Sequence, residues 1–135
     1  MHAEFILQYE RQLLDPFGLT GYGCCEDLTR KLGDVFTLPN IRRISISPFA
    51  DVDKCAPQLK GNYIFSWKPN PSHLVGKFDE ERLYTYIHGA VAVMQEQGCV
   101  PEMVLKDTHT CEHHPERFDR WLAIARKVRV GFGYG

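Results

Sequence analysis

The stretch with the greatest chemical potential is residues 21–27, with the sequence GYGCCED. Cys24, Cys25 and Glu26 stand between an apolar segment and a run of apolar residues at helical spacing, which predicts a strand followed by a helix. In parallel α/β folds, ligands bind beyond the carboxyl ends of the strands. We therefore expect these side chains to belong to the functional site.

A second set of potential metal ligands lies at residues 108–114, with the sequence THTCEHH. Thiolate, imidazole and carboxylate groups bind zinc, and a catalytic zinc needs three protein ligands and one open position. Cys24 and Cys111, with either Glu26 or His109, would meet that count, and Cys25 would face the other side of an extended strand. The spacing is not a CxxC pair, so free cysteines and solvated histidines are the alternative interpretation.

Polar side chains also follow the other predicted strands. Lys68, Asn70 and His73 lie in a proline-rich loop, KPNPSHL, where Lys68 could bind an anionic group of a substrate or act as an electrophile. We expect Asn70 and His73 to contact the substrate, whereas simple solvation of Lys68 is the alternative. Asp107 ends an otherwise apolar strand, where a carboxylate must be paired by a hydrogen bond or used in catalysis.

Hydrophobic periodicity predicts helices and strands in alternation. Helices are expected over residues 4–14, 28–36, 51–59, 79–97 and 115–128, and strands over 17–23, 41–47, 62–67 and 101–107. The predicted order is one leading helix, within residues 1–15, followed by four strand-then-helix units in a single domain over residues 1–135. The glycine-rich tail at residues 129–135 is expected to be flexible.

This order predicts an α/β fold whose connections suit right-handed parallel crossovers. Four such units make half of a (β/α) barrel, because a closed barrel needs eight strands and about 250 residues. The chain could close one only by combining two copies. An open four-stranded doubly wound sheet is the competing architecture.

Composition narrows the class of protein. With 44% hydrophobic residues the chain can bury a core, and its formal charge of -1 gives no basic footprint for nucleic acid or an anionic membrane. No apolar run approaches the roughly 20 residues of a bilayer-spanning helix. The five cysteines suit reduced thiols or metal ligands better than a disulfide framework, and we expect a cytoplasmic protein.

Four motifs in this order resemble a known family. They are FGLTGYGCCEDL, LPNIRRISISPFAD, YIFSWKPNPSHL and VLKDTHTCEHHPERFDRW. Together they resemble the carboxyl-terminal half of the uroporphyrinogen decarboxylase superfamily, and look closest to uroporphyrinogen-decarboxylase-like proteins and corrinoid-dependent methyltransferases. That family has a TIM barrel fold, so the resemblance implies that the four units correspond to strands five to eight of the barrel, without the first half.

The methyltransferase branch implies a zinc site. Its members hold zinc with a His-x-Cys pair after strand five and a cysteine after strand eight; Cys24 and Cys111 match the two cysteines, and Tyr22 stands in place of the histidine. Glu26 or His109 could supply the third ligand, and Tyr22 is expected to contact the substrate. Zinc would activate a thiol acceptor for a methyl group carried on a corrinoid or pterin.

Two other functions remain open. The chain could be a decarboxylase-like protein that binds a tetrapyrrole, or a non-catalytic half barrel whose exposed strand edges drive self-association. In each case we expect the isolated chain to be incomplete. The expected partners are a second copy or another half barrel, with a corrinoid protein as a further partner if the chain transfers methyl groups.

Overall fold

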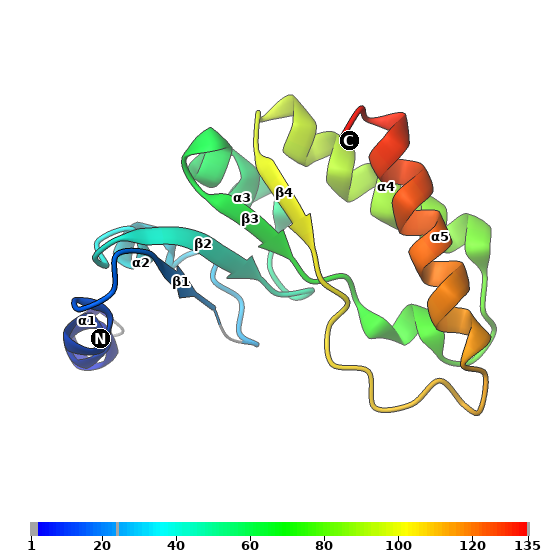
Figure 1. Ribbon diagram of the computed structural model, residues 1–135, viewed down its shortest axis with the longest axis horizontal. Coiled ribbons are helices and arrows are strands. Elements are labelled where there is room, and N and C mark those ends of the chain that lie inside the picture. The colour runs from blue at the N-terminus through cyan, green and yellow to red at the C-terminus, as the bar shows by residue number, and fades with distance from the viewer. Residues whose placement is uncertain (1–2, 24, 135) are drawn as a thin grey trace.

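The fold is built around a four-stranded, all-parallel sheet with the strand order β1-β2-β3-β4 (Figure 1). The computed structural model describes residues 3–23 and 25–134. Its strands are β1 (Thr20–Tyr22), β2 (Ile41–Ile46), β3 (Ile64–Trp67) and β4 (Val100–Met103). The predicted α/β class with four parallel strands is confirmed. Because all four strands are parallel, their carboxyl ends lie at the same end of the sheet.

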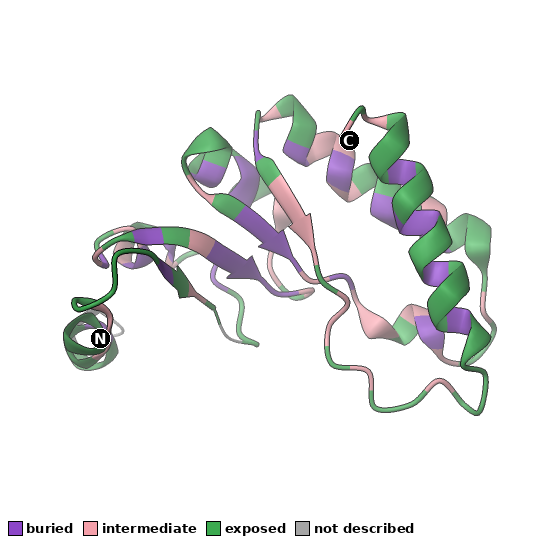
Figure 2. Ribbon diagram, viewed as in Figure 1, coloured by how far each residue is buried: buried purple, intermediate pink, exposed green. Residues whose placement is uncertain are grey.

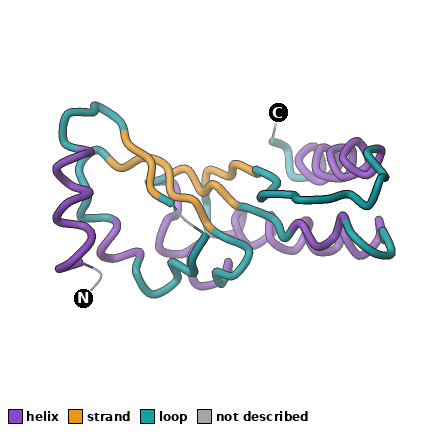
Figure 3. The backbone as a smooth tube through the Cα atoms, turned by 90° about the horizontal axis from the view of Figure 1, so that it is seen from below, coloured by secondary structure: helices purple, strands orange, loops and turns teal. Residues whose placement is uncertain are grey.

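Helices connect each strand to the next. The elements are η1 (Ala3–Leu7, a π-helical turn), α1 (Gln8–Leu14), α2 (Leu32–Val35), α3 (Val52–Leu59), η2 (Lys60–Asn62), η3 (Pro71–Leu74), α4 (Glu80–Glu96) and α5 (Glu116–Gly131). In Figure 1, α2 and α3 lie behind the sheet, α1 lies beyond the β1 edge, and α4 and α5 pack together beside β4. In Figure 3 the helices between the strands lie on one side of the sheet, whereas the helix next to the C-terminus lies level with the strands.

Side-chain caps explain where the two best-defined helices begin. The carboxylate of Asp51 accepts a hydrogen bond from Lys54 N at 3.3 Å at the start of α3, and that of Asp79 accepts one from Arg82 N at 3.0 Å at the start of α4. After α4, Gly98 adopts a φ of +68°, a conformation that glycine permits without strain. The boundaries predicted for these helices therefore hold to within one residue.

The core lies between the sheet and the helical layer. Ile44 and Ile46 of β2, with Phe65 and Trp67 of β3, point into this layer and are at most 2% exposed (Figure 2). They meet the inward faces of α2, α3 and α4. Burial of side chains of this size contributes about 1.5–3 kcal/mol each, so this layer is the main source of stability.

The opposite face of the sheet carries charged side chains beside the exposed apolar side chains of Ile64 and Val100. Arg43 on β2 and Glu102 on β4 reach across β3 and form an ion pair with a nitrogen to oxygen distance of 2.6 Å. Although burial opposes the charged form, the Ser66 hydroxyl and the Arg43 guanidinium hold the pKa of Glu102 below its usual value. Gly23 belongs to the same face, because a Cβ there would lie 2.0 Å from the Ser45 Cβ. Only glycine fits where β1 meets β2.

Apolar side chains on two helices face solvent. On the leading helix, Phe5, Tyr9 and Leu13, which recur at helical spacing, are 73%, 62% and 71% exposed. On α5 the buried residues are Arg117, Trp121, Ile124, Ala125 and Val128, whereas Phe118 and Leu122 are more than one third exposed. The described chain lacks an element to cover these exposed side chains.

The carboxyl-terminal half differs from the prediction at two boundaries. β4 ends at Met103, four residues before the predicted end, because residues 104–107 leave the sheet and enter a long loop. Helix α5 continues to Gly131, into the predicted tail, and Gln95 Nε2 donates a hydrogen bond to Phe132 O at 3.1 Å. Along the described chain, we find no helix with both the length and the apolarity needed to cross a bilayer.

Candidate functional site

The candidate site is the end of the sheet at which the four strands finish, together with the loops that follow them. We call this end of the sheet the rim. Four segments follow the strands there: residues 23–31, 47–51, 68–79 and 104–115. The prediction that the polar loops share one edge is therefore confirmed. Two pairs of loops are held together by specific hydrogen bonds, one pair following β1 and β2 and the other following β3 and β4.

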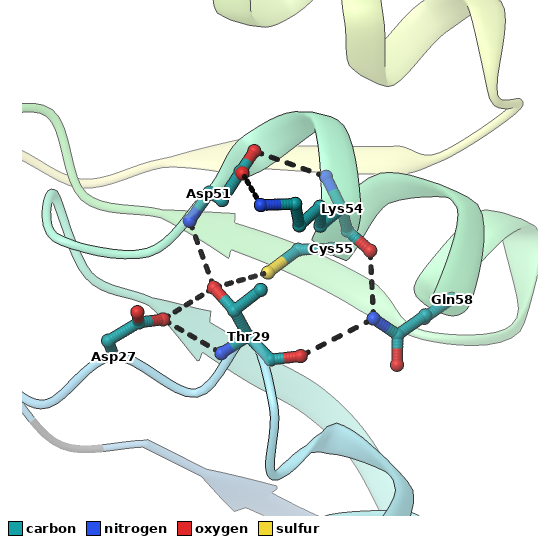
Figure 4. Close-up of polar contacts among 6 residues, drawn as sticks. All are labelled: Asp27, Thr29, Asp51, Lys54, Cys55 and Gln58. Atoms are coloured by element: carbon teal, nitrogen blue, oxygen red, sulfur yellow. Dashed lines mark hydrogen bonds and ion pairs between the residues drawn. The ribbon is translucent and has the colours of Figure 1, made fainter.

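Thr29 joins the first pair of loops (Figure 4). Its hydroxyl oxygen accepts a hydrogen bond from Asp51 N at 3.0 Å and lies 3.7 Å from the Cys55 sulfur, while the same hydroxyl donates to the Asp27 carboxylate. Asp27 also accepts from Thr29 N at 2.8 Å. The side-chain and backbone hydrogen bonds from Thr29 hold the pKa of Asp27 below its usual value. Asp27 therefore orders the turn before α2 and remains charged.

The thiols in the described chain differ in reactivity. Burial raises the pKa of Cys55 from 9.0 to about 11, and burial also raises that of Cys99. Both are enclosed in the core. Cys25 is exposed and Cys111 is half-buried. Of the four described cysteines, only Cys25 and Cys111 are therefore accessible enough to act as a thiolate nucleophile or a metal ligand.

Aromatic stacking positions the loop after β3. The ring of Tyr86, on α4, lies between His73 and Trp67, with centroid distances of 4.6 and 5.4 Å. Its hydroxyl accepts a hydrogen bond from Asn70 N at 3.1 Å, and Asn70 Oδ1 accepts one from Ser72 N at 2.9 Å. Burial lowers the pKa of His73, which therefore favours the neutral imidazole. Asn70 and His73 are held in place by this stack, while half-buried Lys68 follows the strand directly.

Arg117 joins the second pair of loops. Its guanidinium donates hydrogen bonds to Leu74 O at 2.7 Å, to Gly76 O at 3.0 Å and to Glu112 Oε2 at 3.0 Å. Glu112 also accepts from Gly76 N at 2.7 Å. These contacts, led by Arg117, hold the pKa of the Glu112 carboxyl below its usual value. The long loop after β4 is thereby fixed against the loop after β3, away from β1 (Figure 1).

The predicted zinc ligands are not gathered into one cluster in the described chain. Cys24 lies outside the described residues. Glu26 follows β1 and forms an ion pair with Lys31, whereas exposed His109 and half-buried Cys111 follow β4. β1 and β4 are three interstrand spacings apart, roughly 14 Å. No three His, Cys, Asp or Glu residues in the described ranges form a potential metal site, and zinc ligands must lie within about 2.3 Å of the ion.

The predicted role of Asp107 loses its structural premise. The residue is exposed in the loop after β4 and is not at the end of a buried strand. A solvated carboxylate requires no buried partner, so burial gives no argument for pairing or catalysis, and the catalytic assignment of Asp107 remains a prediction. The unexpected neighbour is Lys106, whose Nζ is buried without a hydrogen-bond partner among the described residues.

Tyr22 lies on β1, the outer strand on the side of the sheet away from β4. It ends β1, is half-buried, and lines a groove of about 350 Å³ between α1 and β1 together with Glu10, Leu13 and Glu26. Its position at a strand end agrees with the expected place of a substrate contact. The assignment of Tyr22, Asn70 and His73 to substrate binding remains a prediction.

Sequence reasoning missed the residues that hold the rim together. Arg117 precedes Trp121, Ile124 and Val128 at intervals of four, seven and eleven residues, so it occupies a position on the buried stripe of α5. A charged residue on an apolar stripe must find buried partners, and that signal was present. Thr29 gave no comparable signal, because its partner Asp51 follows a different strand.

Comparison with known proteins gives no family: the chain matches no family model, no curated protein and no solved structure.

Proposed function

We propose that the chain is half of a (β/α) barrel enzyme and that the carboxyl-terminal edge of its sheet is half of an active site. The observation that supports this most strongly is the single parallel sheet whose four strands follow sequence order, because consecutive strand-helix units of a barrel have that arrangement. Barrel enzymes place their active sites at this edge. In this proposal the units correspond to strands five to eight, and another half barrel supplies the remaining rim.

The proposed reaction is methyl transfer to a thiol acceptor, with the methyl group carried on a corrinoid or pterin. Its support is the order of the four sequence motifs that resemble corrinoid-dependent methyltransferases. Zinc would supply acceptor activation in such an enzyme. The described donors do not fit a closed zinc site, because Glu26 follows β1 and Cys111 follows β4, so we derive no step through the metal from this chain.

The rim residues have roles that do not depend on the metal. The stack of His73 on Tyr86 presents a neutral imidazole beside Asn70. Lys68, at the end of β3, would attract an anionic group of the substrate. Arg117 and Glu112 would hold the loop with His109 and Cys111 in place before the chain assembles with the other half barrel.

Metal analysis of the purified protein tests the reaction class. Because the described ligands do not meet within one chain, zinc binding in this proposal requires the second half barrel, and we expect zinc to copurify only with the assembled wild-type protein and to be lost in Cys24→Ser and in Cys111→Ser. Cys25→Ser is the matched control, since it changes an adjacent thiol outside the proposed ligand set, and it should keep its zinc. Wild-type protein without zinc, purified in the absence of chelators and still without zinc after incubation with the metal, would contradict the proposed reaction.

A further inference from the structure

The sheet has an apolar groove beside each of its two unpaired edges. The groove along β4 encloses about 540 Å³ between β4 and α5, and its lining includes Met103, Leu122 and Ala125. The groove along β1 lies between β1 and α1 and includes Ile6 and Leu13. Each groove therefore combines an open strand edge with the apolar side of a helix.

The two grooves carry opposite charges. Arg126 and Arg129 line the groove along β4, and both are exposed. Glu10 lines the groove along β1, and its Oε2 atom is buried without a hydrogen-bond partner in the described chain. In the first groove Trp121, only 6% exposed, has an indole Nε1 that likewise lacks an acceptor in the described chain. A buried polar atom without a hydrogen-bond partner destabilises the fold, so these two atoms would gain from partners on a bound molecule.

The direction of the strands makes the grooves complementary as well. Because all strands are parallel, the open edge of β4 in one copy can receive β1 of another copy in the orientation of the existing ladder. Directly after β4, Val104 N donates to Trp67 O of β3, so the preceding residue Met103, at the end of β4, turns its backbone groups toward the open edge. Those groups are available to a further strand.

We propose that the occupant of the groove along β4 is the α1–β1 edge of a second copy of this chain, and that the same contact is repeated once by two-fold symmetry. In the dimer, β4 of each copy would pair with β1 of the other, which gives two interfaces and closes a barrel of eight strands. Side chains alone can fill the interior of a barrel of that size. The exposed stripe of Phe5, Tyr9 and Leu13 would cover Leu122 of the partner. This inference rests on the half-barrel part of the proposed function but not on the reaction.

Light scattering and sedimentation of the full chain measure the association. We expect a concentration-dependent dimer of twice the 15.5 kDa chain mass. Leu13→Asp, on the surface of α1, should weaken dimerisation at least about tenfold without unfolding the monomer, since it places a charge in the apolar contact. Phe49→Asp is the matched control, because Phe49 is also exposed but lines neither groove.

Charge reversal provides the decisive test. Glu10→Arg and the double variant Arg126→Glu/Arg129→Glu should each weaken the homodimer about tenfold or more. An equimolar mixture of the two variants should form a heterodimer. At each of its two interfaces the side chain at position 10 of one copy then meets side chains of opposite charge at positions 126 and 129 of the other. Glu96→Arg and Lys77→Glu, at exposed positions outside the grooves, should behave as wild type.

A chain that remains monomeric at high concentration would overturn the proposal, as would a dimer that is indifferent to both reversals or a mixture that fails to recover. The recovery cannot arise from a variant that fails to fold. Zinc content is measured on the same samples. A dimer with recovery but without zinc would support this surface and contradict only the proposed reaction.

Discussion

At the scale of single residues, the turn before α2 depends on Thr29, which takes part in hydrogen bonds with four other residues. Its hydroxyl donates to Asp27, accepts from Asp51 N, and lies near the sulfur of Cys55. Its backbone carbonyl accepts from Gln58 Nε2 at 3.5 Å. One small side chain therefore sets the position of the loop after β1 relative to helix α3 (Figure 4).

Replacement of Thr29 by valine tests this role. Valine keeps the shape but leaves Asp51 N and Asp27 without the hydroxyl, so we expect the free energy of unfolding to fall by about 1–3 kcal/mol. Urea denaturation measures the change. Thr85→Val is the matched control, because the Thr85 hydroxyl bonds only Glu81 O within its own helix, and its effect should stay below about 0.5 kcal/mol. Equal effects at both sites would contradict the assignment.

Cys55 should make stability depend on pH in alkaline solution. Burial raises the pKa of its thiol to about 11 in the folded state, above the ordinary 9.0 of the unfolded chain. The folded state then binds the proton more tightly, so the stabilisation is complete below pH 9 and is lost as the pH rises from 9 to 11. Denaturation series across this range should show a steeper loss for wild type than for Cys55→Ala.

Cys25→Ala is the comparison for that measurement. Cys25 is exposed, and its removal should leave the steepness of the pH dependence as in wild type. If Cys55→Ala and Cys25→Ala gave the same slope as wild type, the buried thiol would not be the source of the alkaline loss.

At the scale of elements, Arg117 connects α5 to η3. Because its guanidinium serves two backbone carbonyls and one carboxylate, the amino-terminal end of α5 and both rim loops are held as one unit. The helix itself begins only at Glu116, after Glu112 and His113 adopt left-handed conformations with φ of +54° and +64°. Such conformations are unfavourable for non-glycine residues and persist where surrounding contacts hold them.

We therefore expect Arg117→Met to destabilise the protein by about 2–3 kcal/mol, since it leaves the buried carbonyl of Leu74 unpaired and removes the hydrogen bonds to Gly76 O and Glu112. Thermal or chemical denaturation would measure this loss. Arg120→Met is the matched control on the same helix. Its partner Glu80 is exposed, and an exposed ion pair contributes at most about 1 kcal/mol. A larger loss from the control than from Arg117→Met would refute the argument.

At the scale of the whole molecule, the sheet is stable in its centre and open at its edges. β2 and β3 have a neighbour on both sides, while β1 and β4 have one each. We expect amide hydrogen exchange to be slowest in β2 and β3 and faster in β1 and β4 when the protein is dilute. Mass spectrometry after exchange would measure this for each strand.

Protection in β1 and β4 should rise with protein concentration if the edges pair in a dimer. The exposed loop at residues 104–115 provides the internal reference, because it lies outside the sheet and should exchange at the same rate throughout. Edge strands that are unaffected by concentration, in a sample that dimerises, would place the contact elsewhere on the molecule.

The sequence by itself determined the alternation of strands and helices, the parallel direction of the strands and the gathering of four polar loops at one edge. Periodicity and caps such as Asp51 and Asp79 are local, because a side chain two to four residues away satisfies them.

Only the tertiary structure decided which side chains meet across the sheet. Arg117 contacts residues more than forty positions earlier, and Thr29 meets a residue that follows another strand. The same holds for the stripe on α1, whose periodicity predicted burial although the described chain supplies nothing to cover it. Periodicity reports that a helix has an apolar side, whereas the arrangement of the other elements determines whether that side reaches a core, because burial is a property of the assembled fold.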